Sequence, residues 1–195
     1  MDIYANDILV ENKITKLKEQ KELLEQYRKG LVQQRLFSQE LRFKDQNGEY
    51  FPEWEEKKAE EVFINHTNKK HNGDLPLLAV TQDKAVVDRS QIRIDIKSFD
   101  KSILSYKIID VGDFVINLRS FQGGIEYSNV HGNCSPAYTV LKPITAINGD
   151  FYRYYLKKES FIEDLSRTVI GIRNGKQISF SAFATLNLPY PSVDE

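Results

Sequence analysis

Apolar residues recur at intervals of seven along the first part of the chain. They stand at Ile3, Val10, Leu17, Leu24 and Leu31, which we call the helix seam. No proline interrupts residues 3–37, so the pattern predicts one helix about 50 Å long. A sustained seven-residue repeat keeps one face turned towards a second helix and favours a coiled coil. The alternative is that the helix folds back onto its own domain.

The pattern changes after the Asn-Gly step at residues 47–48, which is typical of a tight turn. Short β-rich segments follow, and glycines separate them. A helix is expected at 150–168, started by Asn148, and a second, short helix at 179–184 precedes an extended tail. The sequence therefore predicts an α+β domain of about 140 residues that carries a long N-terminal helix. The expected strands are residues 77–81, 91–96, 113–118, 124–130 and 137–143.

Composition narrows the class of protein. Of 195 residues, 41% are apolar and 28% charged, which is enough to form a core and excludes wholesale disorder. The single cysteine, Cys134, cannot form an internal disulfide. No run of about 18 apolar residues and no signal peptide occurs, so we expect a soluble cytoplasmic protein without a membrane partner. The net charge of -1 predicts modest non-specific binding to phosphate.

Enzyme signatures are weak. His131 and Cys134 are three residues apart in a glycine-containing loop, without a nucleophile elbow or an orienting third group, so Cys134 is expected to be a packed small residue. His66 and His71 are flanked by Lys69 and Lys70, whose charge opposes a metal cation. No phosphate-binding or dinucleotide-binding glycine motif occurs, and we expect no cofactor. Catalysis by this chain alone is therefore not expected.

Polar and basic side chains that could contact base edges or phosphates occur in the expected loops and at strand ends. In this group Arg119 and Gln122 suit hydrogen bonds to guanine and adenine, whereas Gly123 and Gly124 would let the backbone turn or approach closely. An ordinary polar turn is the alternative for each cluster. The candidates for DNA contact are Lys69, Lys70, Arg89, Arg119, Gln122, Arg173, Asn174, Lys176 and Gln177.

The order of these segments resembles the specificity subunit of type I restriction-modification systems. KLKEQKELLEQYRKGLVQQRLFSQELRF followed by FPEWEEKKAEEVF is similar to that family's spacer helix and the entry to its second domain. The likeness continues through LPLLAVTQDKAVV, GDFVINLRSFQGGIEYSNVHGNCSPAY, IGIRNGKQISFSAF and LNLPYP, and so covers nearly the whole chain.

The resemblance implies a spacer helix at residues 1–42 and a target recognition domain of α/β character at 43–195. It also implies a subunit that catalyses nothing and places methyltransferase (modification) subunits and an endonuclease/translocase subunit on split double-stranded DNA. Full-length members look like two helices and two recognition domains, whereas this sequence holds one of each. We therefore expect a homodimer through an antiparallel helix pair, which reads a target with symmetry-related halves.

Two other classes remain open. One is a coiled-coil regulatory protein that binds restriction-modification subunits without reading DNA. The other is a stand-alone hydrolase that uses Cys134 and His131.

Overall fold

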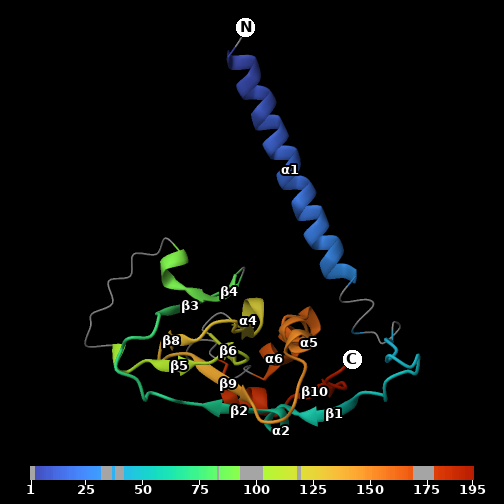
Figure 1. Cartoon of the computed structure of the whole chain (residues 1–195), viewed down its shortest axis with the longest axis vertical. Helices are drawn as coiled ribbons and strands as arrows, with labels where there is room; N and C mark the ends of the chain where they lie inside the picture. The colour runs from blue at the N-terminus through green and yellow to red at the C-terminus, as the bar shows by residue number, and fades with distance from the viewer. Residues whose placement is uncertain are drawn as a thin grey trace. The chain divides into compact units, whose positions relative to one another are not determined.

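The computed structural model describes residues 3–31, 37, 42–82, 84–92, 103–117, 120–168 and 178–195. The side chains at positions 3–7, 29, 120 and 121 are outside this description. The chain divides into two compact units, Met1–Lys44 and Asp45–Glu195, which are described separately (Figure 1).

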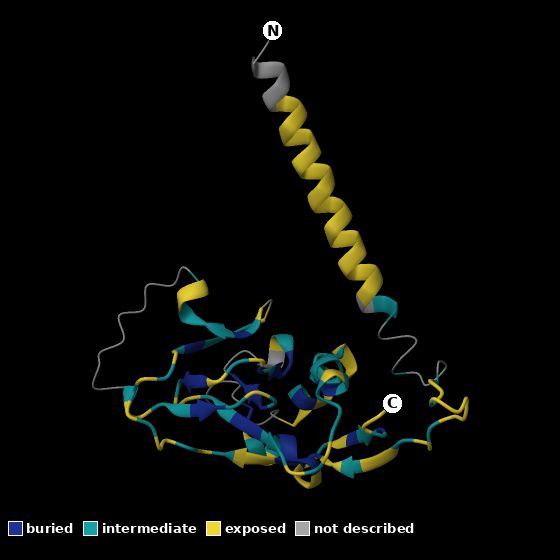
Figure 2. Ribbon diagram, viewed as in Figure 1, coloured by how far each residue is buried: buried dark blue, intermediate teal, exposed yellow. Residues whose placement is uncertain are grey.

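The first unit is dominated by the continuous helix α1 (Ile3–Leu31). Its 29 residues correspond to about 43 Å of helix. The prediction of a long N-terminal helix is confirmed up to Leu31, and positions 32–36 lie outside the described residues. Figure 2 shows that the described side chains are exposed along almost all of α1.

The second unit is an α+β domain, which confirms the predicted fold class. Its central sheet has the strand order β2-β9-β6-β7, with antiparallel pairing throughout. The register sets Phe63 opposite Pro143 and Phe114 opposite Leu141. The four strands are β2 (Phe63–His66), β6 (Phe114–Ile116), β7 (Glu126–Tyr127) and β9 (Thr139–Pro143).

Three two-stranded ladders extend around this sheet (Figure 1). The expected extended tail pairs with a strand near the domain entry, and a parallel bridge from Leu77 to Asn133 joins the other two ladders. The pairs are β1 (Glu55–Lys58) with β10 (Asn187–Tyr190), β3 (Leu78–Thr81) with β4 (Ala85–Asp88), and β5 (Lys107–Ile109) with β8 (Gly132–Cys134).

Short helices connect and cover these strands. Two start where the sequence predicts, because the Asn148 side chain accepts a hydrogen bond from Phe151 N (3.1 Å) and the Ser179 side chain accepts one from Ala182 N (3.1 Å). The described helices of this domain are α2 (Ala59–Val62), the 3-10 helix η2 (Arg89–Gln91), α4 (Ser120–Gly123), α5 (Gly149–Tyr155), α6 (Glu159–Arg167) and α7 (Phe180–Ala184).

The expectation of a single helix over 150–168 is wrong, because the helix is interrupted between α5 and α6. The carbonyl oxygen of Leu156 accepts a hydrogen bond from Ile125 N (3.2 Å) at the sheet, and Lys158 is extended. That carbonyl is therefore bonded outside the helix ladder, and a second helix starts at Glu159.

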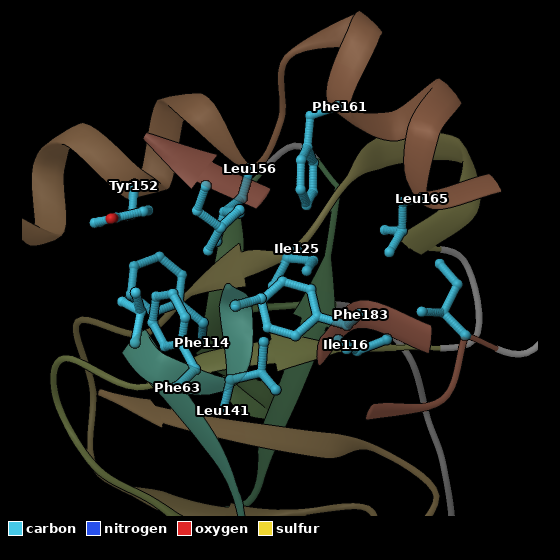
Figure 3. Close-up of a cluster of buried hydrophobic side chains, with 14 residues drawn as sticks. Phe63, Phe114, Ile116, Ile125, Leu141, Tyr152, Leu156, Phe161, Leu165 and Phe183 are labelled. Atoms are coloured by element: carbon cyan, nitrogen blue, oxygen red, sulfur yellow. The ribbon is translucent and has the colours of Figure 1, made fainter. Parts of the chain in front are cut away.

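The main core lies between the central sheet and α5, α6 and α7. Figure 3 shows Tyr152 of α5, Leu156 just after α5, and Phe161 and Leu165 of α6 directed towards the sheet residues. Phe63 is fully buried, and its ring meets those of Phe114 (centroids 5.4 Å apart) and Tyr152 (5.5 Å) edge to face. This core fixes the ends of the strands and helices that carry the candidate loops.

The expected strand at 91–96 is wrong at its start, since Gln91 ends the 3-10 helix and residues 93–102 lie outside the description. The expected strand at 124–130 is reduced to the two residues of β7. The other three expected strands are confirmed as β3, β6 and β9.

Candidate nucleic-acid interface

Cys134 is a structural residue. Its side chain is fully buried on β8, and burial raises the pKa of the thiol to about 12. The expectation that His131 lacks an orienting group is wrong, because its Nδ1 lies 2.9 Å from Asp110 Oδ1. A thiol that stays protonated at neutral pH is nevertheless a poor nucleophile, so the pair supports no hydrolase.

The ring of His71 is held by backbone groups on both sides. Its Nδ1 accepts a hydrogen bond from Gly73 N (3.1 Å), and Nε2 then donates to the Tyr106 carbonyl oxygen (3.1 Å). With both nitrogens engaged, this histidine has no lone pair left for a metal. The described residues contain no group of three or more histidine, cysteine or carboxylate side chains suited to a metal ion.

Lys69 and Lys70 project from the loop after β2, and both are exposed. The Asn68 side chain shapes this loop by accepting a hydrogen bond from Lys70 N (2.9 Å). Burial lowers the pKa of the nearby Lys107 ammonium, and the charge of Lys69 lowers it further. Lys107 Nζ donates to the Tyr138 carbonyl oxygen (2.6 Å). Lys69 and Lys70 are thus exposed cations in a loop close to the half-buried Lys107 ammonium.

Arg89 is less accessible than expected. It begins η2, its guanidinium lies over the ring of Tyr106 (5.9 Å to the centroid), and its Nε and Nη1 atoms are buried without a hydrogen-bond partner among the described residues. Arg89 therefore lies on the same side of the domain as the β5 region but is half-buried there.

Gln122 lies on α4 and is exposed. The interpretation of the two following glycines is confirmed. Gly124 has φ +85°, and a Cβ there would collide with the Leu156 carbonyl oxygen and lie 2.9 Å from Lys157 Cα. A Cβ on Gly123 would lie 2.8 Å from Cγ and from Nε2 of Gln82. These contacts bring α4 against the β3–β4 turn and the α5–α6 junction.

The structure thus places Gln82 beside Gly123 and Lys157 beside Gly124, although the sequence does not single out Gln82 or Lys157. Gln82 and Lys84 are exposed, and Lys157 Nζ donates to the Gln82 carbonyl oxygen (3.5 Å). The polar residues between β3 and β4 are typical of a hairpin turn and could have marked Gln82 and Lys84 as exposed. The proximity of Gln82 to α4 arises from long-range packing. The remaining predicted DNA contacts, Arg119, Arg173, Asn174, Lys176 and Gln177, lie outside the described residues.

No family model matches the chain, and the search of curated proteins returned no match. Among solved structures, the chain is similar to the HsdS subunit from Thermoanaerobacter tengcongensis, with 15% identity, a TM-score of 0.45, and coverage of 96% of this chain and 46% of that one. It is also similar to a chain from a study titled "Structural basis underlying complex assembly and conformational transition of the type I R-M system", with 17% identity, a TM-score of 0.48, and coverage of 97% and 47%.

The first structure is thus described as an HsdS subunit, and the second belongs to a study of a type I R-M system. The chain spans about half the length of the structures it matches. Across its described segments, no helix is long and apolar enough to cross a membrane.

Proposed function

We propose that this chain is a DNA sequence-recognition subunit of a type I restriction-modification assembly. Its α+β domain would read one half of a split target, and α1 would pair with α1 of a second copy. Catalysis would belong to methyltransferase and endonuclease subunits placed by this scaffold. The observation that carries the proposal is α1 itself, a continuous helix whose seam residues Val10, Leu17 and Leu24 are exposed, in a sequence that resembles the family's segment order.

The exposure of the seam supports helix pairing. The side chains of Val10, Leu17 and Leu24 are 56%, 56% and 67% exposed. Leu31 is partly buried, and the side chain of Ile3 lies outside the description. A single helix cannot cover its own apolar stripe, and burying one leucine contributes about 2 kcal/mol. A partner helix is therefore the direct way to stabilise α1.

Charge favours the antiparallel orientation. Residues 13–18 form a basic block with three lysines, and residues 19–25 form an acidic block with three glutamates and one lysine. A parallel pair would set each block beside its own copy, where like charges repel. An antiparallel pair centred on Glu19 would set each block opposite its complement and bring Ile14 opposite Leu24. The same symmetry would place two identical recognition domains at the two ends of the pair.

A charge-swap experiment tests this pairing. Lys13→Glu with Lys16→Glu should weaken the dimer in light scattering at tens of micromolar, because acidic residues would then face Glu22 and Glu25. Adding Glu22→Lys and Glu25→Lys should restore it, because the four changes together recreate opposite charges across the pair. Leu24→Asp should also impair dimerisation by burying an unpaired charge. A stable wild-type monomer would contradict the proposed pairing.

In the proposed DNA contact, the lysines and Gln122 of the domain have separate roles. Exposed lysines such as Lys69 and Lys70 would hold phosphates and set the register, while the Gln122 side chain would meet a base edge. Lys69→Ala with Lys70→Ala should weaken binding on all sequences alike and lower the slope of log affinity against log salt by about 2. An unchanged salt slope would remove these two residues from the interface, and Lys44→Ala in the other unit is the matched control.

A further inference from the structure

In the β3–β4 turn, hydrogen bonds of the Thr81 side chain link the described residues on the two sides of position 83. Thr81 Oγ1 accepts a hydrogen bond from Lys84 N (3.1 Å) and donates to the Ala85 carbonyl oxygen (3.2 Å). Ala85 has φ +58°, and it is the one non-glycine with positive φ in the part of the chain that the structure describes. Such strain costs on the order of 1 kcal/mol and persists only where the surroundings impose it.

The turn is also held from outside. Lys157 Nζ lies 3.5 Å from the Gln82 carbonyl oxygen and 2.5 Å from Glu126 Oε2, and Glu126 is fully buried. One ammonium group therefore ties the turn to a carboxylate anchored in the domain interior. This contact links the backbone of Gln82 to the domain interior.

The Gln82 side chain lies directly across the backbone of α4. A Cβ on Gly123 would come within 3.0 Å of its Cγ, Cδ and Nε2 atoms, so only glycine at position 123 leaves this space open. Gln82 is exposed even so, as are Lys84 in the same turn and Gln122 in the next helix. The Gln82 side chain thus packs against Gly123, about 40 residues away in the sequence, while remaining accessible to solvent.

We propose that Gln82 is a specificity-determining residue that reads a base edge of double-stranded DNA, and that Gly123 positions it. A glutamine amide can bond adenine in the major groove through two hydrogen bonds, and Lys84 would hold an adjacent phosphate. A preorganised amide discriminates better than a mobile one, because less conformational entropy is lost on binding. This inference rests on the proposed function and names a further reading residue of the same site.

Substitution at Gly123 can change the position of the Gln82 side chain without changing the stability of the domain. The atoms that an alanine there would displace belong to the flexible Gln82 side chain, so the domain should keep its unfolding temperature. At Gly124, by contrast, the clash is with backbone, and Gly124→Ala should destabilise the domain. Gly123→Ala therefore moves the proposed reading group without removing it.

The test uses the full chain assembled with its methyltransferase subunits, and it measures methylation of a library of DNA targets. Gln82→Ala should lower discrimination at one base pair about 5- to 150-fold, which corresponds to the worth of one bidentate contact. Gly123→Ala should lower it at the same base pair, and the double variant should match Gln82→Ala alone. The matched control is Gln91→Ala, an exposed glutamine beyond the far end of β4, which should leave the motif unchanged.

An unaltered motif with Gln82→Ala would overturn the role of Gln82. Additive effects of Gln82→Ala and Gly123→Ala, or effects at different base pairs, would overturn the positioning role of Gly123. A wild-type assembly that methylates no defined motif would instead contradict the proposed function, so the two failures can be told apart.

Discussion

Replacement of Lys157 by methionine should destabilise the α+β domain and loosen the candidate interface. The change keeps the length of the side chain and removes its charge. Glu126, which is fully buried, then loses the ammonium that lies 2.5 Å from its Oε2 atom. Removing one partner of a fully buried ion pair costs about 3–5 kcal/mol. The Lys157 side chain is 32% exposed, so water can partly replace it, and we expect a loss of about 2–3 kcal/mol.

Urea unfolding followed by fluorescence of Trp54 measures this loss. Trp54 is the only tryptophan and belongs to the same domain, where its Nε1 donates to Glu195 Oε2 (2.8 Å). With a denaturant slope of about 2 kcal/mol/M, the urea midpoint should fall by roughly 1 M. Glu126→Gln combined with Lys157→Met should cost less than Lys157→Met alone, because no buried negative charge then remains without the Lys157 ammonium. Lys70→Met, at an exposed site, is the control.

A midpoint for Lys157→Met within about 0.2 M of the wild type would refute this reasoning. It would mean that Glu126 does not depend on Lys157 for its charge, and that the tie between the domain interior and the β3–β4 turn is weak.

Three further predictions concern stability and reactivity. Because the Cys134 thiol is buried and its pKa is about 12, alkylation at pH 8 should occur only in the unfolded protein; rapid labelling of the folded protein would contradict its burial. Burial raises the pKa of Asp113 above 3.8, so this group contributes stability at low pH that is lost as pH rises through the folded pKa. The unfolding free energy of Asp113→Asn minus that of the wild type should therefore increase from pH 3 to pH 7. A difference that does not change with pH would contradict the raised pKa of Asp113. Ala85→Gly relieves the strain of the positive φ but increases the conformational entropy of the unfolded chain. The unfolding free energy should therefore rise by less than about 1 kcal/mol, seen as a small rise in the urea midpoint; a clear fall would show that Ala85 is not strained.

Long or strongly patterned elements were predictable from the sequence. Helix α1 follows from the seven-residue repeat, and β3, β6 and β9 follow from runs of β-branched residues. Strand β1 was missed because Glu55–Lys58 is entirely charged and gains its strand conformation by pairing with β10. Strand β8 was missed because Gly132–Cys134 contains no β-branched or aromatic residue and gains its strand conformation by pairing with β5.

The candidate interface was only partly predictable for the same physical reason. Gln122 and the turn-forming glycines at 123 and 124 can be recognised from local sequence, but the residues that a side chain at 123 or 124 would meet cannot. The proximity of Gln82 and Lys157 to these residues depends on how the sheet and the α5–α6 junction pack together, since that junction forms where the sheet captures the Leu156 carbonyl. Local propensity carries no information about such long-range contacts.

The most direct test of the account is a genome-wide map of methylated positions in cells that co-express this chain with its methyltransferase subunits. A two-fold symmetric pair of recognition domains should direct methylation to a single split motif whose two halves are related by two-fold symmetry and separated by a spacer of fixed length. Methylation without a defined motif, or a complete absence of methylation that depends on this chain, would contradict it.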